Sequence, residues 1–204
     1  MNSKPHARRT FLRTAMVGVV APMGMVGCSP ERVSFQASDI TGAPYANDFR
    51  LRDHLGNIRT MLDFRGKVVV VFFGFTQCPD VCPTSMNTMA EVKRLLRDQG
   101  NRLQVLFITV DPERDTNAML KEYMQNFDPS FLALRPEPGE LKAVADGFKV
   151  YYAKVEGKTP TSYSMDHSAG KYIFDSDGRI RLFSKYGTEA SVIAEDIGKL
   201  LRNQ

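Results

Sequence analysis

Two stretches rich in β-branched and aromatic residues stand out in the hydrophobic pattern of the chain, Val68–Phe73 and Leu103–Val110. Stretches of this length and composition predict strands that are buried on both faces of a sheet. From Pro83 to Gln99, apolar residues recur at helical spacing, and the Gly100 that follows is typical of a helix end. This helix would bury Met86, Met89, Val92, Leu95 and Leu96. The pattern therefore predicts a strand–helix–strand unit.

Weaker patterns on either side of this unit predict the rest of the fold. In chain order we expect a short hairpin turning at Asp53–Asn57, a helix capped by Thr116, a short helix from about Glu140 to Asp146, a hairpin turning at Asp175–Gly178, and a last helix over Thr188–Leu201. A strand–helix–strand unit followed by a β-hairpin and a helix is the thioredoxin-like arrangement. The predicted fold class is therefore α/β, a thioredoxin-like fold with an N-terminal β-hairpin extension.

The first part of the chain has the pattern of an export signal. Arg8–Arg13 (RRTFLR) is typical of a twin-arginine signal, a weakly apolar stretch follows, and Met25–Cys28 (MVGC) is similar to a bacterial lipobox. The alternative is a single membrane-spanning anchor, but a spanning helix needs about 20 apolar residues and this stretch, about 14 residues long, is interrupted by glycine and proline. We therefore expect export across the bacterial cytoplasmic membrane, with lipidated Cys28 holding the protein facing the periplasm or cell exterior.

These features divide the chain into three parts. We expect residues 1–27 to be a twin-arginine-type lipoprotein signal peptide, residues 28–46 a polar tether, and residues 47–204 one thioredoxin-like domain. The signal holds four of the 27 basic residues and no acid, so its removal leaves 23 basic and 23 acidic residues. Because the mature chain is neutral, we expect no nucleic-acid partner.

Two cysteines in the expected domain carry the candidate chemistry. Cys78 and Cys82 lie four residues apart, where the buried strand turns into the helix. Pro83 suits the first helical position, which makes Cys82 the expected N-cap, and a helix N-terminus favours a thiolate. Two such sulfurs can converge on one ion or on each other. The residues alone therefore predict either a soft-metal clamp or a redox pair.

A histidine joins these thiols in the predicted fold. His167 lies just before the late hairpin strand, in a segment that we expect beside the first strand–helix turn. His54 lies in a predicted turn, and we interpret it as solvated. Met165 could offer a thioether but is interpreted as a packing residue.

Four separated motifs resemble one known family, the Sco/SenC copper proteins of cytochrome c oxidase assembly. The resemblance runs from about Asp39 to the C-terminus, and its carriers are Asp63–Lys67 (DFRGK), Cys78–Pro83 (CPDVCP), Val110–Thr116 (VDPERDT) and Asp166–Gly170 (DHSAG). It implies a thioredoxin-like copper-binding domain over residues 47–204. By resemblance, the copper ligands are Cys78, Cys82 and His167, with Asp80 and Asp111 as nearby acids.

The donor set agrees with copper on chemical grounds. Thiolates select soft Cu(I), and imidazole binds Cu(I) or Cu(II). Zinc would prefer a fourth ligand, and no other cysteine or suitable histidine is available. Copper as Cu(I), Cu(II) or both is therefore the expected metal.

Three functions follow from this site. The first is a metallochaperone that delivers copper to the CuA centre, with the CuA-bearing subunit of the oxidase or another copper chaperone as its partner. The second is a thiol–disulfide reductase, with Cys78 and Cys82 as the redox pair, that keeps the CuA cysteines reduced. The third is a peroxidase, since Cys82–Thr84 is similar to the peroxiredoxin cysteine, but Phe75 and Pro79 replace the proline and threonine that should precede it. We expect the metallochaperone.

Overall fold

The computed structural model describes residues 1–2, 33–159 and 162–202. Apart from its first two residues, the expected signal peptide over residues 1–27 lies outside these ranges, as does the expected lipidation site Cys28. Both therefore stay predictions. Within the described ranges, no helix has the length and apolar character needed to cross a membrane.

The centre of the domain is a mixed β-sheet. Strands β4 (Val68–Gly74) and β5 (Leu103–Thr109) run parallel in the register Val68↔Leu103, and every residue of both strands is buried. Among the described residues the sheet has eight strands in the order β1-β10-β9-β4-β5-β6-β2-β3. The remaining strands are β1 (Ser38–Asp39), β2 (Leu51–Asp53), β3 (Ile58–Arg59), β6 (Leu132–Arg135), β9 (Lys171–Phe174) and β10 (Ile180–Ser184).

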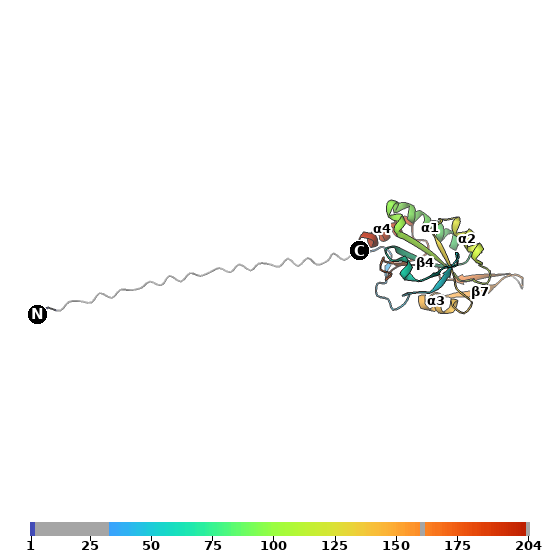
Figure 1. The fold of residues 1–204 in the computed structure, drawn as a ribbon, viewed down its shortest axis with the longest axis horizontal. Helices are drawn as coiled ribbons and strands as arrows, with labels where there is room; N and C mark the ends of the chain where they lie inside the picture. Colours follow the sequence, from blue (N-terminus) through green and yellow to red (C-terminus); the bar gives the residue numbers. More distant parts are fainter. Residues whose placement is uncertain (3–32, 160–161, 203–204) are drawn as a thin grey trace. The chain divides into compact units, whose positions relative to one another are not determined.

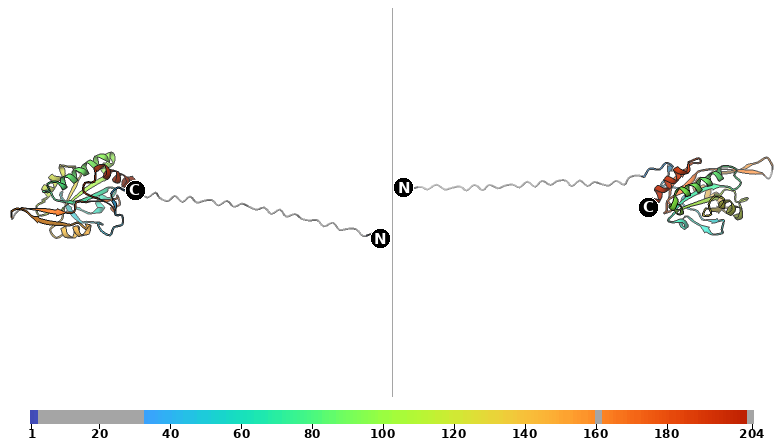
Figure 2. Two further views of the ribbon diagram at one scale, coloured as in Figure 1. Left: turned by 180° about the vertical axis from the view of Figure 1, so that it is seen from behind. Right: turned by 90° about the horizontal axis from the view of Figure 1, so that it is seen from above.

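Helices cover both faces of this sheet (Figure 1). The α-helices are α1 (Val81–Leu95), α2 (Asn117–Gln125), α3 (Leu141–Phe148) and α4 (Ala190–Arg202), and the 3-10 helices are η1 (Met61–Phe64) and η2 (Arg97–Arg102). Helices α1, α2 and α4 lie on one side of β4, where α1 and α4 pack together, and α3 lies on the other (Figures 1 and 2). There the ring of Phe148 packs 5.2 Å from that of Phe73, centroid to centroid. The core thus occupies both faces of β4.

A second, two-stranded ribbon was absent from the sequence prediction. Strands β7 (Tyr152–Glu156) and β8 (Tyr163–His167) pair antiparallel with each other in the register Tyr152↔His167. The ribbon projects from the body of the domain (Figure 1). Nine of its ten residues are exposed or half-buried, so they lack the hydrophobic pattern that identifies a core strand. Strand β6 was missed as well, because its four residues are too short a signal.

Part of the segment expected to be a tether, N-terminal to residue 47, takes part in the fold. Strand β1 pairs antiparallel with β10, and the buried carboxylate of Asp196 accepts hydrogen bonds from the backbone N–H groups of Gln36 and Ala37. Ala46 is fully buried in the core. The folded unit therefore includes the chain from about Val33. The sequence concealed this because the apolar side chains that attach the segment to the core, such as Phe35, Ile40 and Tyr45, follow no regular spacing, and the other attachments are backbone hydrogen bonds.

Candidate metal centre

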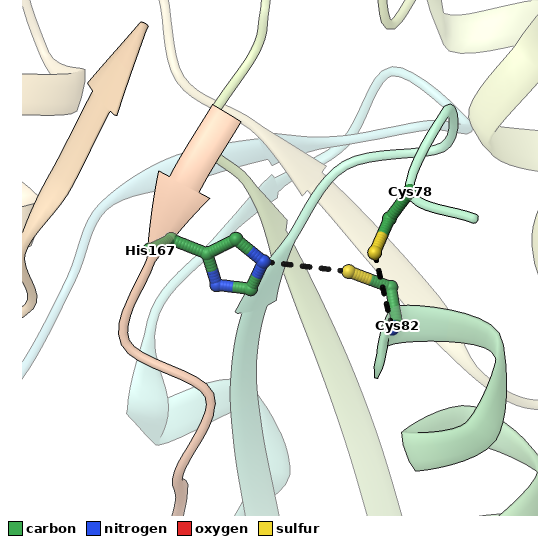
Figure 3. A group of neighbouring side chains, drawn as sticks. All are labelled: Cys78, Cys82 and His167. Atoms are coloured by element: carbon green, nitrogen blue, oxygen red, sulfur yellow. Dashed lines mark hydrogen bonds between the residues drawn. The ribbon is translucent and has the colours of Figure 1, made fainter. Parts of the chain in front are cut away.

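Three elements bring Cys78, Cys82 and His167 together at the C-terminal end of β4 (Figure 3). Cys78 lies in the loop that follows β4, Cys82 lies in the first turn of α1, and His167 is the last residue of β8. The ligand atoms of the three side chains all lie within 4.8 Å of one another. The structure thus joins two sequence-adjacent thiols to an imidazole 85 residues from Cys82.

The immediate contacts among these groups are polar. The Nε2 atom of His167 lies 3.5 Å from the Sγ atom of Cys82, and the backbone N–H of Cys82 donates to the Sγ atom of Cys78 over 3.4 Å. Both cysteines are free thiols; Cys82 is fully buried and Cys78 is half-buried. Of the two sulfurs, Cys78 is therefore the one accessible from outside.

The expectation that Cys82 caps α1 is wrong. The helix begins at Val81 with Asp80 at the N-cap position, so Cys82 is already inside the first turn. As a result, the backbone N–H of Cys82 donates a hydrogen bond from the helix N-terminus to the sulfur of Cys78. Burial raises the pKa of the Cys82 thiol well above its ordinary value, although a hydrogen bond from the Phe75 backbone opposes this. The burial of Cys82 outweighs the helix-terminus effect that its sequence position suggested.

The tautomer of His167 is set by its own backbone neighbourhood. Nδ1 lies 3.0 Å from the carbonyl oxygen of Ser168, and since a carbonyl only accepts, Nδ1 carries the proton. The Nε2 lone pair therefore faces the thiols. Burial lowers the pKa of His167 and so favours the neutral imidazole, which is the form that binds metals. Phe72 and Phe75 meet the imidazole edge-on, with ring centroids 6.1 and 5.9 Å away.

Gly74, the last residue of β4, makes room for the buried sulfur. A Cβ atom built on it would lie 2.8 Å from carbon atoms of both Phe72 and Phe107 and 2.9 Å from the Sγ atom of Cys82. Real Cβ atoms do not approach heavy atoms this closely. Cys82 can therefore occupy its position only because residue 74 has no side chain.

The two acids that the resemblance placed near the site lie outside the cluster of three ligands. Asp80 is exposed and accepts a hydrogen bond from the Thr84 hydroxyl over 3.1 Å. Asp111 is buried, accepts from the Tyr163 hydroxyl over 2.9 Å and forms an ion pair with Arg114. Asp111 therefore contributes to the framework that surrounds the cluster.

Sequence reasoning missed a second buried acid that holds the cysteine loop. The Asp115 carboxylate accepts hydrogen bonds from the backbone and hydroxyl of Thr76, the latter over 2.6 Å, and from the Thr109 hydroxyl over 2.5 Å. It thereby ties the start of the loop that carries Cys78 to the end of β5. Burial raises the pKa of Asp115 despite these hydrogen bonds. The only signal in the sequence was its place in the VDPERDT motif.

The remaining histidine and methionine candidates lie outside the metal centre and make contacts within the fold. The Nδ1 atom of His54 accepts the backbone N–H of Ala133 over 3.0 Å, so this imidazole is bonded to β6 and is not simply solvated. Met86 and Met89 are fully buried in the core, and Met165 is nearly so. These methionines therefore pack as expected.

The fold and the cluster together define a class of protein. It is a thioredoxin-like domain with a Cys-x-x-x-Cys pair at the first strand–helix turn and a histidine from a distant strand. Such a set of soft and borderline donors can hold one thiophilic ion, and its two thiols can also form a disulfide.

Comparison with known proteins identifies the family within this class. Residues 37–202 match the model of the SCO1/SenC family, and the chain belongs to that family. It is 41% identical over 133 residues to the SCO2-like protein of Rickettsia felis, a match that covers 65% of each chain. It is also 35% identical over 193 residues to the mitochondrial SCO2 homologue of Bos taurus, covering 91% of this chain and 71% of the relative.

A solved structure extends the likeness to three dimensions. The structure of Bradyrhizobium japonicum ScoI with copper bound matches with a TM-score of 0.69 at 38% identity, covering 75% of this chain and 97% of that one. The family resemblance drawn from the four motifs and the thioredoxin-like fold are both confirmed.

Proposed function

We propose that this protein is a copper metallochaperone that delivers copper to the CuA centre during cytochrome c oxidase assembly. The observation that carries the proposal is the convergence of two free thiols and a correctly oriented imidazole within 4.8 Å. The copper-bound relative, which shares the fold and is 38% identical over the 75% of this chain that it covers, supports the choice of metal. Copper is here the cargo, held until a partner site takes it.

The three side chains have separate roles in this proposal. Cys78 and Cys82 supply thiolates, which favour Cu(I), and each loses its proton when the metal binds. His167 supplies the Nε2 lone pair, and the bond from Nδ1 to Ser168 keeps that lone pair directed inward. Because Cys78 is the more accessible sulfur, a partner thiolate would meet the ion from its side.

A second function is favoured by the same pair of thiols. In a thiol–disulfide reductase, the accessible Cys78 would attack a partner disulfide, and Cys82 would then release the partner and close a Cys78–Cys82 disulfide. Two thiols of this protein become a disulfide, and the partner disulfide becomes two thiols, so electrons and protons balance. The difference in exposure between the two sulfurs suits this division of labour.

Substituting His167 separates the two functions. His167→Ala removes a copper ligand but leaves both thiols, whose exchange depends on thiolate fraction and access. If delivery is the function, the variant should bind copper weakly and fail to restore CuA in cells, although its thiols still titrate. Full restoration at matched protein levels would refute delivery and favour reduction. His54→Asn is the control, since it removes an imidazole but retains an acceptor for Ala133.

The stoichiometry provides an independent test. Titration of the reduced protein with Cu(I) should end at one ion per chain, and Cu(II) should give a thiolate-to-copper absorption band. The double variant Cys78→Ser, Cys82→Ser should lose both signals. An unchanged end point in that variant would exclude this cluster as the copper site.

We also propose that the protein is exported across the bacterial cytoplasmic membrane and is anchored by a lipid on Cys28, facing the periplasm or cell exterior. The twin-arginine and lipobox patterns of residues 1–28 support this. Mass spectrometry of membrane-extracted protein should find a lipidated N-terminal Cys28. An intact residue 1–27 segment on the mature protein would refute it.

A further inference from the structure

The position of His167 depends on an element with little support from the main sheet. β8 pairs with β7 alone among the described strands, and a two-stranded ribbon is at best marginally stable by itself. Cys78 and Cys82, in contrast, follow directly from the fully buried β4. A polar contact between the ribbon and the cysteine loop would therefore add to the edge-on packing of Phe72 and Phe75 in holding the imidazole at a constant distance from the two sulfurs.

Arg114 makes that contact. Its Nη1 group donates to the carbonyl oxygen of Tyr163 over 2.8 Å and to Oε1 of Gln77 over 3.1 Å. Tyr163 is the first residue of β8, the strand that ends at His167, and Gln77 immediately precedes Cys78. One guanidinium thus bridges the strand that carries the imidazole and the loop that carries the first thiol.

The guanidinium is itself fixed in place. Its Nε group is bonded to the buried carboxylate of Asp111, whose other oxygen accepts the Tyr163 hydroxyl. The guanidinium carbon lies 3.6 Å from the centroid of the Tyr163 ring and 5.9 Å from that of Phe75. Phe75 in turn packs edge-on against His167. Charge-assisted bonds and cation–π contacts of this kind hold an arginine fork more rigidly than a single bond would.

We propose that Arg114 is a positioning residue that fixes the β8 strand against the cysteine loop and so sets how tightly His167 completes the copper site. In the described part of the chain it bonds to neither thiol nor to the imidazole, and it acts through Tyr163 and Gln77. The proposal rests on the proposed copper site but concerns the geometry of the apoprotein, which can be tested without metal.

Two substitutions separate positioning from charge. Arg114→Gln removes the fork and the charge, whereas Arg114→Lys keeps the charge but cannot reach Asp111, Gln77 and Tyr163 together. Substituting a group that orients a metal ligand typically lowers metal affinity by about 10–100-fold, and we expect a loss of copper affinity of that order in both variants. Restoration of copper affinity by Arg114→Lys would overturn positioning in favour of charge. Arg94→Gln, in an exposed pair with Glu91, is the matched control and should change nothing.

A double-mutant cycle shows whether the effect passes through His167. If Arg114 works by placing the imidazole, Arg114→Gln should lower copper affinity by less than about 2-fold in the His167→Ala background, because the positioned group is already gone. An equal loss in both backgrounds would mean general destabilisation and overturn the proposal.

A measurement on the metal-free protein keeps this test separate from the proposed function. In the reduced apoprotein, the NMR signals of the His167 imidazole should be sharp in the unaltered chain and in Arg94→Gln, and exchange-broadened in Arg114→Gln. Absence of copper binding by the unaltered protein would refute the proposed function, yet the imidazole signals would still decide the role of Arg114. Identical imidazole signals in all three proteins would overturn that role.

Discussion

The packing around Gly74 leads to a prediction in which stability and metal binding change together. In Gly74→Ala the new methyl group would meet Phe72, Phe107 and the Cys82 sulfur at 2.8 to 2.9 Å. All three side chains are fully buried, so none can move into solvent to relieve the overlap. Either the rings shift within the core or the sulfur leaves its position.

The size of the effect follows from two opposing terms. Overpacking of a well-filled core costs about 1–3 kcal/mol. Replacing glycine in a strand restores about 0.5–1 kcal/mol through the smaller entropy of the unfolded chain. Taking the middle of each range, we expect Gly74→Ala to lower the free energy of unfolding by about 1 kcal/mol. For a domain of this size, each kcal/mol shifts Tm by about 2–4 °C.

The assay compares two chemically identical substitutions. Gly147 is an exposed residue of α3, and a Cβ built there meets no heavy atom within 4 Å. Gly147→Ala should therefore raise the free energy of unfolding, by about 0.5–1 kcal/mol from helix propensity. Thermal melts of both reduced apoproteins give the stability difference, and Cu(II) titration followed by the thiolate absorption band shows whether the site has moved.

The two variants should consequently differ in sign. Gly74→Ala should also shift or weaken the thiolate absorption band, because the displaced group is a sulfur ligand in the proposed site. A Gly74→Ala protein that melts no lower than the unaltered chain and keeps an unchanged absorption band would refute the argument that residue 74 needs the space of glycine.

Two further predictions concern buried charges outside the metal centre. Burial lowers the pKa of Lys171, on β9, to about 8, so the unfolded chain binds more protons than the folded one between pH 8 and the ordinary lysine pKa of about 10.4. Lys171→Met should therefore be more stable than the unaltered chain at pH 7, by about 1–3 kcal/mol, in urea unfolding. This difference should disappear as the pH rises across that window, and comparing the two proteins cancels the opposite contribution of the buried Cys82 thiol, which both contain. A difference that does not change with pH would contradict this. Asp196→Ala should leave the N–H groups of Gln36 and Ala37 without their acceptor and lower the free energy of unfolding by about 1–3 kcal/mol. Hydrogen exchange at both amides should become faster. Unchanged exchange would show that β1 holds this segment without Asp196.

The sequence alone determined the central unit of the fold. The strands Val68–Gly74 and Leu103–Thr109 were predictable because both faces of each are buried, which leaves a continuous apolar stretch in the chain. The helix cap at Thr116 was also predictable, since its hydroxyl accepts the N–H of Met119 three residues on. These features depend on neighbours along the chain, so a local pattern is enough to reveal them.

The candidate ligands were also accessible from the sequence, but their environment was not. Cys78, Cys82 and His167 could be named from motifs, whereas the burial of Cys82 reversed the pKa shift expected from its place in the helix. Desolvation depends on all the atoms around a group, most of which are remote in the sequence. Only the folded chain supplies them.

Tertiary structure alone decided how the site is held together. Arg114 carries no pattern that distinguishes it from a solvated arginine, because its bonds to Gln77 and Tyr163 join segments that are distant in the chain. The β7–β8 ribbon is similarly hidden, since strands whose side chains are mostly exposed or half-buried need no apolar pattern. Hydrophobic periodicity predicts which face of a segment is buried, but it does not predict which distant polar group that segment will contact. For that reason the candidate ligands could be named from the chain, and the framework that positions them could not.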